Sequence, residues 1–369
     1  MKMVTIIGAR PQFIKAATVS RVIRTQSEIE EVIVHTGQHY DANMSEIFFT
    51  ELEIPEPHYN LGIGGQLHGQ MTGRQLEAIE EVLIKEKAEL VLVYGDTNST
   101  LAGALAAAKL NIPVVHVEAG LRSFNKNMPE EVNRILTDHL AELLFAPTQA
   151  AVDNLAEEGL KDQKVSVSGD VMYDAALFYG EKAEAKKALL DKIAVQHESY
   201  ILVTVHRAEN TDDASRLKWI VDQLIKISAY IQVVLPLHPR TRKALIELGL
   251  IDSVLKSMIV IEPVGYLEMV LLEKHAKCIV TDSGGVQKEA YFHNRPCITL
   301  RNETEWIELI MSGSNRLCEF SGDNLLQMVI TEQAKIKTDP TLYGTGNAAE
   351  KIVDEIIRHT QKQVQAHNG

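Results

Sequence analysis

The chain has 369 residues, enough for two domains at roughly 150 residues each. Hydrophobic residues make up 45% and aromatic residues only 5%, so we expect a globular protein whose cores are built from Val, Ile, Leu and Ala. The formal net charge of −13, without a basic tail, argues against nucleic acid as a partner, because phosphate backbones are bound by clustered positive charge.

The cysteines and the apolar runs are typical of a cytoplasmic protein. Cys278, Cys297 and Cys318 are an odd number with no close pair, which fits neither a disulfide framework nor a cysteine-rich zinc site. The first apolar run, residues 3–9, is too short for a signal peptide, and no run reaches the roughly 18 residues of a membrane span. We therefore expect buried, unpaired cysteines, a cytoplasmic location and no membrane partner.

In the first half of the chain, short β-rich runs alternate with amphipathic stretches. The helical stretches cover residues 69–87, 98–110 and 129–141, and the last begins with Pro129 and two glutamates, as many helices do. Strands that are apolar on both faces and alternate with helices are typical of a parallel sheet covered on both sides. We expect these strands at residues 4–7, 32–35, 90–94, 114–117, 143–146 and 165–167.

The same alternation continues in the second half, and a helix is expected over residues 347–365. The pattern predicts an α/β protein of two doubly wound domains that face a cleft. We place the first domain at residues 1–172 and the second at residues 173–347, with a terminal helix at about 348–369. Strands of the second half are expected at residues 201–205, 233–235, 259–261, 278–281 and 297–300.

Charged or titratable residues follow several of the expected strands, where open α/β sheets bind their ligands. Asp96 is explained equally well as the cap of the helix after it, and Glu130 as a stabiliser of a helix N-terminus. Glu118 precedes Ala-Gly and not a helix, so capping does not explain it and a functional role is favoured. His206 beside Arg207 is a candidate contact for a phosphate or a leaving group.

The segment after the fourth expected strand of the second half gives the most specific physical signal. Ser283, Gly284 and Gly285 lie between a strand and a helix, where backbone amides and a hydroxyl can hold a diphosphate. Glu289 lies in the first turns of that helix, where a carboxylate can accept hydrogen bonds from ribose hydroxyls. With Arg10 after the first strand, this pattern indicates a nucleotide diphosphate as the ligand.

Motifs for other cofactors are absent from the sequence. Gly62 and Gly64 match the start of a G-x-G-x-x-G loop, but Leu67 occupies the third position and no strand precedes it. There is no Walker loop, no H-E-x-x-H pair and no G-x-S-x-G elbow. We therefore predict no nicotinamide or other cofactor and no metal site.

Six motifs occur in order along the chain: Gly8-Ala9-Arg10-Pro11-Gln12-Phe13-Ile14-Lys15, Gly95-Asp96-Thr97, His116-Val117-Glu118-Ala119-Gly120-Leu121-Arg122, Pro129-Glu130-Glu131-Val132-Asn133-Arg134, His206-Arg207-Ala208-Glu209-Asn210 and residues 282–289. Together they resemble the non-hydrolysing UDP-N-acetylglucosamine 2-epimerase family, from residue 1 to about residue 357. This resemblance implies the GT-B fold, in which two Rossmann-like domains hold a UDP-sugar in the cleft between them. It also implies a homodimer and a C-terminal helix that packs on the first domain.

The resemblance implies a 2-epimerase that works without a cofactor. UDP leaves by anti elimination across C1–C2, a 2-acetamidoglycal forms, and UDP adds back with the other configuration at C2. This chemistry requires carboxylates as acid and base and positive groups for the departing diphosphate. By resemblance, Asp96, Glu118 and Glu130 supply the carboxylates and His206 assists the diphosphate. The residues implied to bind UDP and the sugar are Arg10, Lys15, Arg122, Arg134, Arg207, His238, Ser283, Gly284, Gly285, Gln287 and Glu289.

Three motif variants indicate the substrate. Enzymes that act on UDP-N-acetylglucosamine usually have Gly-Thr-Arg-Pro-Glu, His-Arg-Arg-Glu and Thr-Glu-Arg-Pro-Glu, whereas here Gln12, Ala208 and Trp306 change these motifs. The variants resemble the branch that converts UDP-2,3-diacetamido-2,3-dideoxy-glucuronate to its mannuronate epimer for lipopolysaccharide of the O-antigen type. Two alternatives stay open: a UDP-N-acetylglucosamine 2-epimerase that makes UDP-N-acetylmannosamine, and a GT-B glycosyltransferase.

Overall fold

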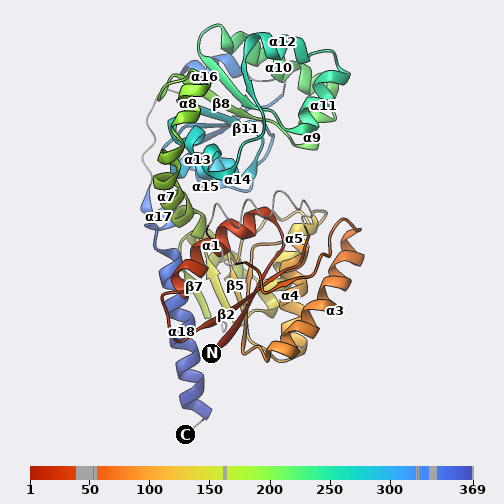
Figure 1. Ribbon diagram of the computed structural model, residues 1–369, viewed down its shortest axis with the longest axis vertical. Helices are drawn as coiled ribbons and strands as arrows, with labels where there is room; N and C mark the ends of the chain where they lie inside the picture. The colour runs from red at the N-terminus through yellow and green to blue at the C-terminus, as the bar shows by residue number, and fades with distance from the viewer. Residues whose placement is uncertain are drawn as a thin grey trace. The chain divides into compact units, whose positions relative to one another are not determined.

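The computed structural model describes residues 1–38, 53, 56–160, 164–320, 322, 324–331 and 339–367. The chain divides into two compact units, Met1–Ala175 with Pro340–Gly369, and Ala176–Asp339 (Figure 1). Each unit contains one parallel β-sheet with helices packed on it, which confirms the expected α/β fold. The division after Ala175 falls within helix α7 (Val171–Ala183).

The first unit contains a seven-stranded sheet with the order β3-β2-β1-β4-β5-β6-β7. The direction of winding reverses between β1 and β4, and in such sheets ligands bind beyond the carboxyl ends of the strands at this switch point. The strands are β1 (Lys2–Ile7), β2 (Glu30–His35), β3 (Tyr59–Asn60), β4 (Leu90–Tyr94), β5 (Val114–Val117), β6 (Leu143–Ala146) and β7 (Lys164–Val167).

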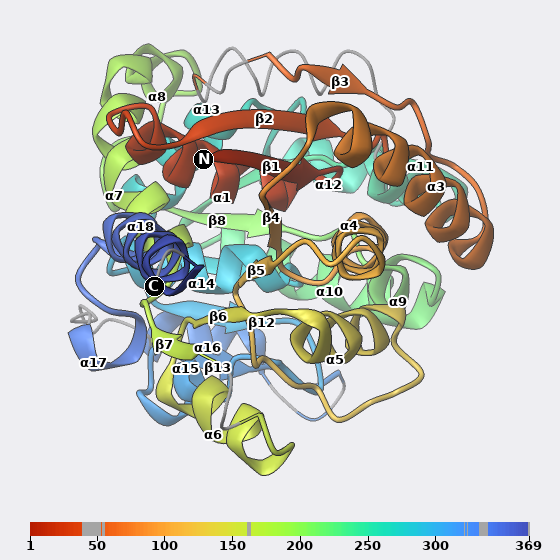
Figure 2. The same ribbon diagram turned by 90° about the horizontal axis from the view of Figure 1, so that it is seen from below.

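Helices cover both faces of this sheet. Figure 2 shows α1 (Arg10–Ile23) and α18 (Ala348–His367) on one face, while α3 (His68–Glu86), α4 (Asn98–Lys109) and α5 (Pro129–Leu140) lie on the other. The core between sheet and helices is aliphatic, and α4 contributes mainly alanines, which let this helix approach the strands closely. The remaining helices of the unit are α6 (Gln149–Glu157) and α17 (Pro340–Tyr343).

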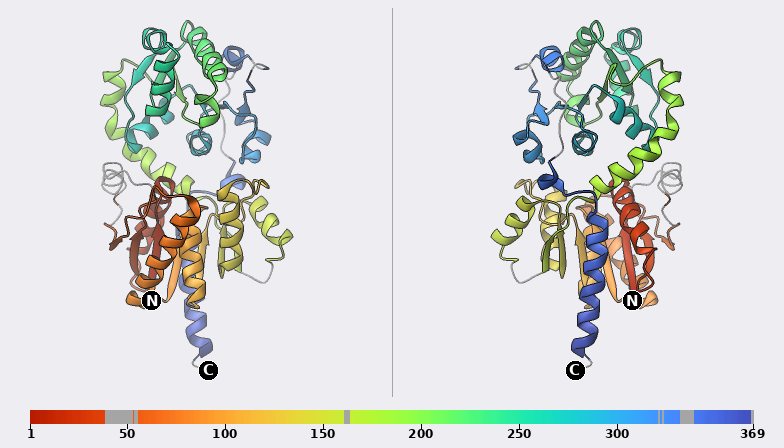
Figure 3. Two further views of the ribbon diagram at one scale, coloured as in Figure 1. Left: turned by 90° about the vertical axis from the view of Figure 1, so that its right-hand side faces the viewer. Right: turned by 90° about the vertical axis from the view of Figure 1, so that its left-hand side faces the viewer.

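Helix α18 joins the end of the described chain to the first unit. It packs against α1, and its last turns extend past the sheet (Figure 3). The carboxylate of Asp174 in α7 holds the start of α18, because its two oxygens accept hydrogen bonds from the amides of Ala348 and Ala349 at 3.1 and 2.8 Å. A buried carboxylate thus replaces the solvent that would otherwise satisfy the first amides of this helix.

The second unit contains a six-stranded parallel sheet with the order β10-β9-β8-β11-β12-β13, and its switch point lies between β8 and β11. The strands are β8 (Tyr200–Thr204), β9 (Gln232–Pro236), β10 (Ile259–Ile261), β11 (Cys278–Thr281), β12 (Cys297–Thr299) and β13 (Asn315–Leu317). The helices are η1 (Glu184–Lys186), α8 (Ala188–Lys192), α9 (Ala208–Thr211), α10 (Ala214–Ser228), α11 (Pro239–Glu247), α12 (Ile251–Ser257), α13 (Tyr266–His275), α14 (Gly284–Phe292), α15 (Ile307–Met311) and α16 (Leu325–Thr331).

Every strand expected from the sequence is present, whereas the edge strands β3 and β13 were missed. Both are two or three residues long and contain Asn60 or Asn315, so no apolar run marks them. The three cysteines are buried and none of them forms a disulfide, as expected. Among the helices of the described ranges, none combines the length and the apolar character that a membrane span requires.

The burial of Asp174 predicts a pH-dependent stability, which the hydrogen bonds from the Ala348 and Ala349 amides only partly offset. Burial raises the pKa of the Asp174 carboxyl from 3.8 to about 6, and Asp170 adds to the shift. Because the folded state holds this proton more tightly than the unfolded chain, the contribution of Asp174 to the free energy of unfolding falls as the pH rises from about 4 to about 6. A shift of about two units corresponds to roughly 3 kcal/mol.

Asp174→Asn cannot titrate, so its cost should be larger at about pH 4 than at about pH 7.5, by up to roughly 3 kcal/mol. Urea unfolding of both proteins at the two pH values measures this difference. An equal cost at both pH values would contradict the assigned cause.

Candidate active site

In the first unit, a buried glutamine joins the two loops at the switch point of the sheet. Gln12 Oε1 accepts hydrogen bonds from the amides of Gly8 and Ala9 after β1, at 2.8 and 3.0 Å. Its Nε2 donates to the carbonyl of Tyr94 at the end of β4 and to the Thr100 hydroxyl, both at 2.9 Å. A glutamate could not donate these two bonds while ionised, so the amide variant in this motif has a structural cause.

Glu118 is held at this edge by a lysine from another element. It follows β5 with φ = 71°, a left-handed conformation that is strained for a residue with a side chain. Lys15 of α1 forms an ion pair with its carboxylate, and both side chains are largely buried. Gly95 lies directly against the pair, since a Cβ there would be 3.2 Å from Glu118 Oε2 and 3.3 Å from Lys15 Nζ. The sequence therefore brings a carboxylate and a lysine together beside a backbone that must lack a side chain.

Asp96 is held in the same region by α5. Arg134 forms ion pairs with Asp96 and, at 2.9 Å, with Glu131. Burial lowers the pKa of the Arg134 guanidinium, but the carboxylates of Asp96, Glu131 and Glu118 raise it by more. Asn133 Nδ2 donates to the backbone carbonyl of Asp96 at 3.0 Å. Asp96, Glu118, Lys15 and Arg134, all expected site residues, thus lie in one region of the first unit.

The two glutamates at the start of α5 have different surroundings. Glu131 is buried and accepts hydrogen bonds from the amides of Ser123 and Phe124 at 2.9 and 2.8 Å. Burial raises the pKa of Glu131, but these amides and Arg134 lower it by more, so the carboxyl stays ionised. Glu130 is exposed. Glu131 therefore shapes the loop before α5, while Glu130 is the one accessible to a ligand.

A buried network around Asp138 supports the loops that follow β4 and β5. His116 in β5 contacts Asp138 Oδ1 through Nδ1 at 2.6 Å and the carbonyl of Gly95 through Nε2 at 2.7 Å. Asp138 Oδ2 accepts hydrogen bonds from the Gly120 amide at 3.1 Å and from Arg122 Nη1 at 2.7 Å. Burial raises the pKa of Asp138, but His116 and Arg122 lower it by more.

The surroundings of Arg122 differ from the expected substrate contact. Its guanidinium is 1% exposed, and besides Asp138 it binds both oxygens of Glu158 at 2.7 Å. A side chain that is buried and bonded to two carboxylates has no free face for a ligand. We therefore correct the expectation for Arg122 from substrate binding to support of the loop that carries Glu118.

In the second unit, the loop after β8 is fixed by the aspartate that ends β11. Asp282 is fully buried and accepts hydrogen bonds from the amides of His206 and Arg207, at 3.0 to 3.1 Å. Asn210 Nδ2 donates to the same carboxylate at 3.0 Å. The ring of His206, 39% exposed, places Nδ1 at 3.4 Å from Asp282 Oδ1.

His238 lies beside His206, with 5.5 Å between the ring centroids. Its Nδ1 accepts a hydrogen bond from the amide of Arg240, so the proton of the neutral ring is on Nε2. Burial and the neighbouring His206 lower the pKa of His238, which favours this neutral form. The exposed Nε2–H can therefore donate to an anionic ligand.

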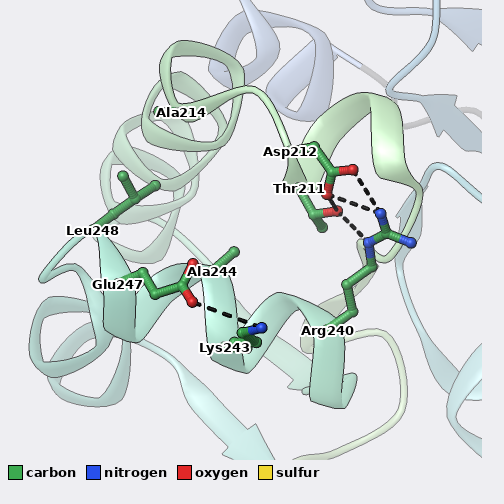
Figure 4. A pocket seen from close by; sticks show the side chains of 8 residues that line it. All are labelled: Thr211, Asp212, Ala214, Arg240, Lys243, Ala244, Glu247 and Leu248. Atoms are coloured by element: carbon green, nitrogen blue, oxygen red, sulfur yellow. Dashed lines mark hydrogen bonds and ion pairs between the residues drawn. The ribbon is translucent and has the colours of Figure 1, made fainter.

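A hollow of about 390 Å³ lies next to this region, between α9, α10 and α11. Figure 4 shows that its charged groups bind one another, Arg240 with Asp212 at 2.7 Å and Lys243 with Glu247 at 3.9 Å. Since these charges are neutralised within the hollow, it does not resemble an anion site.

The start of α14 has the features expected of a diphosphate site. Ser283 is the N-cap, and its hydroxyl forms no hydrogen bond within the described part of the chain. A Cβ at Gly284 would collide with the carboxylate of Glu305, whereas Gly285 faces open space. Trp306 Nε1 donates to the Gly284 carbonyl at 2.9 Å, and Lys288 lies over its ring at 4.1 Å from the centroid. Trp306, one of the three motif variants, thus holds the turn that contains Gly284 and Gly285 in place.

Two expected ligand contacts on α14 are buried. Gln287 Oε1 accepts hydrogen bonds from Thr304 and Asn315 at 2.7 and 2.9 Å, and its Nε2 donates to the Ser283 carbonyl at 3.3 Å. Gln287 is therefore corrected from a ligand contact to a support of the turn. Glu289 is 8% exposed on the same helix.

The remaining expected residues are cations. Arg207 is half-buried. Burial raises the pKa of the nearby Glu305, but the charges of Arg301 and Arg207 contribute to lowering it below its usual value. Arg10 is the first residue of α1, and its side chain lies outside the described residues.

In the described ranges, no cluster of three or more His, Cys, Asp or Glu side chains is arranged to hold a metal.

Several supporting residues were missed by the sequence analysis. His116 interrupts an otherwise apolar strand, which is a signal that a buried partner exists. Glu131 and Asp138 lie three residues before and four residues after the expected Arg134 in α5, so they share one face of the helix with it. Asp282 had no such signal, because an aspartate before Ser-Gly-Gly is expected in any turn.

Comparisons with known proteins agree with this geometry. The sequence profile of a family described as UDP-N-acetylglucosamine 2-epimerase matches residues 21–357. A protein of Pseudomonas aeruginosa named UDP-2,3-diacetamido-2,3-dideoxy-D-glucuronate 2-epimerase is 53% identical over 97% of this chain and 100% of its own length. A UDP-N-acetylglucosamine 2-epimerase homolog of Methanococcus maripaludis is 52% identical, with the same coverage of both chains.

A solved structure shows the same likeness. The crystal structure of the Methanocaldococcus jannaschii UDP-GlcNAc 2-epimerase in complex with UDP-GlcNAc and UDP matches with a TM-score of 0.86 and 45% identity. The match covers 97% of this chain and 100% of that chain. The expected GT-B fold class is confirmed by this likeness.

The network around Asp138 predicts a large stability cost for its loss. Asp138→Ala removes the buried acceptor shared by His116, the Gly120 amide and Arg122, so the free energy of unfolding should fall by about 3–5 kcal/mol. Glu158→Ala is the matched control, since Glu158 contacts the same arginine from a partly exposed position and should cost only about 1–2 kcal/mol. Urea unfolding measures both, and similar costs would exclude the central role of Asp138.

Proposed function

Because the chain belongs to the UDP-N-acetylglucosamine 2-epimerase family, we propose that it inverts C2 of UDP-2,3-diacetamido-2,3-dideoxy-glucuronate and yields the mannuronate epimer. One observation carries the proposed chemistry. At the switch point of the first sheet, two carboxylates stand beside two cations, Glu118 with Lys15 and Asp96 with Arg134. Carboxylates that are positioned in this way can serve as general acids and bases.

The reaction follows from the weak acidity of the substrate. The C2 proton of a pyranose is not next to a carbonyl, so its removal must accompany the departure of a leaving group. A carboxylate takes the C2 proton, the C1–O bond to UDP breaks, and the electron pair of C2–H forms the C1–C2 double bond of a 2-acetamidoglycal. UDP then adds back at C1 while a proton is delivered to the opposite face of C2. Asp96, Glu118 and Glu130 are the proposed acids and bases.

The second unit is proposed to bind the nucleotide. The amides at the start of α14 and the Ser283 hydroxyl would hold the diphosphate, which the positive end of the helix dipole favours. His206, the Nε2–H of His238 and Arg207 would stabilise the negative charge that develops as UDP leaves. Glu289 would accept hydrogen bonds from the ribose, and Arg10 is a further proposed UDP-binding residue.

The substrate assignment rests on the motif variants and on one relative. Gln12, Ala208 and Trp306 match the diacetamido-uronate branch, and a relative named for that substrate is 53% identical. A 52% identical relative named as a UDP-N-acetylglucosamine 2-epimerase homolog supports the second candidate, conversion of UDP-N-acetylglucosamine to UDP-N-acetylmannosamine. We further propose a cytoplasmic homodimer that needs no cofactor or metal and supplies a sugar for O-antigen lipopolysaccharide.

A direct comparison of the two UDP-sugars tests this proposal. We expect turnover of UDP-2,3-diacetamido-2,3-dideoxy-glucuronate with a kcat/KM at least about 100-fold higher than that for UDP-N-acetylglucosamine, or about 3 kcal/mol in barrier. Higher kcat/KM with UDP-N-acetylglucosamine would establish the second candidate instead.

Isotopes in the same assay test the elimination. When the C1–O bond breaks, an ¹⁸O label at the bridging position becomes equivalent to the other oxygens of the β-phosphate and should scramble. Product formed in D₂O should carry deuterium at C2. Epimerisation with complete retention of the bridging label would exclude elimination and the roles given to the carboxylates.

Two substitutions separate chemistry from nucleotide binding. Glu118→Gln should lower kcat by about 10²–10⁴-fold with little effect on KM, because it removes a positioned acid or base. Glu289→Ala should raise KM by about 10–100-fold with kcat largely kept, because it removes hydrogen bonds to a remote ribose. If both variants changed only KM, the two assigned roles would be untenable.

A further inference from the structure

We propose that Asp282 is the positioning residue of His206, and that it orients the imidazole so that Nδ1 faces the buried carboxylate and Nε2 is presented to the departing diphosphate. The catalytic meaning of this arrangement rests on the proposed function. The arrangement itself is a property of the second unit and can be tested without substrate.

The contacts of Asp282 fix the backbone on which His206 stands. Its carboxylate accepts hydrogen bonds from the backbone amides of His206 and Arg207, so both residues are held at the carboxyl end of β8. Asn210 Nδ2 donates to the same carboxylate and also to the carbonyl of Leu300, which ties in the segment after β12. Three strand ends of the second sheet are therefore joined at one side chain.

The same carboxylate sets the protonation of the ring. Asp282 Oδ1 lies 3.4 Å from His206 Nδ1 and has no exposure to solvent, whereas the histidine ring is 39% exposed. A carboxylate accepts hydrogen bonds and cannot donate them, so at 3.4 Å it favours a proton on the nitrogen that faces it. The other nitrogen, Nε2, then accepts a hydrogen bond in the neutral form of the ring and donates one in the cationic form.

Asp282 also connects this histidine to the proposed diphosphate site. It directly precedes Ser283, the N-cap of α14, and the Ser283 amide donates to the Thr281 hydroxyl at 2.9 Å. The side chain of Asp282 thus binds the loop of His206, while its backbone leads into the turn that would hold the diphosphate. Asp282 therefore lies between the histidine that its side chain contacts and the turn that its backbone enters, and its contact with the ring is like that of the carboxylate that orients a catalytic histidine in other enzymes.

A purely structural role for Asp282 makes a different prediction. If the carboxylate only holds the loop, its loss would lower stability without changing the tautomer of His206. Asn210→Ala provides the matched control, because it removes another buried partner of Asp282 and leaves the carboxylate beside His206.

The first test is spectroscopic and uses the ligand-free protein. In ¹⁵N-edited NMR spectra of histidine side chains, assigned with His206→Asn, neutral His206 should carry its proton on Nδ1 in the wild type and in Asn210→Ala. In Asp282→Asn, whose amide replaces the carboxylate at nearly the same size, the Nε2–H tautomer should become populated. A wild-type ring protonated on Nε2 alone, or an unchanged tautomer in Asp282→Asn, would overturn the proposal.

The second test is kinetic. Asp282→Asn should lower kcat by about 10–100-fold with KM changed less than about threefold, and should add little to the loss already caused by His206→Asn. Equal effects of Asp282→Asn with and without His206 would show that the aspartate acts independently of the ring. Failure of the wild type to turn over either UDP-sugar would refute the proposed function and leave the tautomer result to decide the arrangement.

Discussion

A carboxylate that has no access to water is stable only when several donors surround it, and the strand-end loops of both units are organised by this requirement. In the first unit Asp138 binds His116, Arg122 and the Gly120 amide. In the second unit Asp282 binds two amides of the loop after β8 and the side chain of Asn210. Each aspartate collects its donors from one neighbouring strand and the loop after it, β5 for Asp138 and β8 for Asp282. The loops therefore keep fixed positions relative to the sheet that carries them.

The aliphatic cores and these polar clusters have different tasks. The sheets and helices bury Val, Ile, Leu and Ala and set where each strand ends. The buried polar groups then decide which side chains remain accessible at those ends. Glu131 and Gln287 accept hydrogen bonds from neighbouring loop residues and are buried. Glu130 and Ser283, which lie close to them in the sequence, stay accessible. Preorganisation of this kind lets charged groups act without rearranging during a reaction.

The strands and the residues at their ends could be predicted because apolar runs on both faces mark buried parallel strands and every such run ends at the same edge. The expected strands and the positions of Asp96 and Glu118 at their ends followed from this, whereas Lys15 and Arg134, which lie in helices, were named only through the family resemblance. Arg122 and Gln287 could not be assigned, because a motif does not tell whether an arginine meets a ligand or a buried carboxylate. The edge strands β3 and β13 are fixed by pairing with their neighbours and not by their own composition.

The path of the chain between the units has a consequence for folding during synthesis. Residues of the second unit, Ala176–Asp339, are inserted between the two segments of the first unit. A ribosome therefore completes the second sheet before it makes α18, which the first unit needs to cover α1. We expect the inserted unit to acquire its structure first, and the unit that begins the chain to be the last to close.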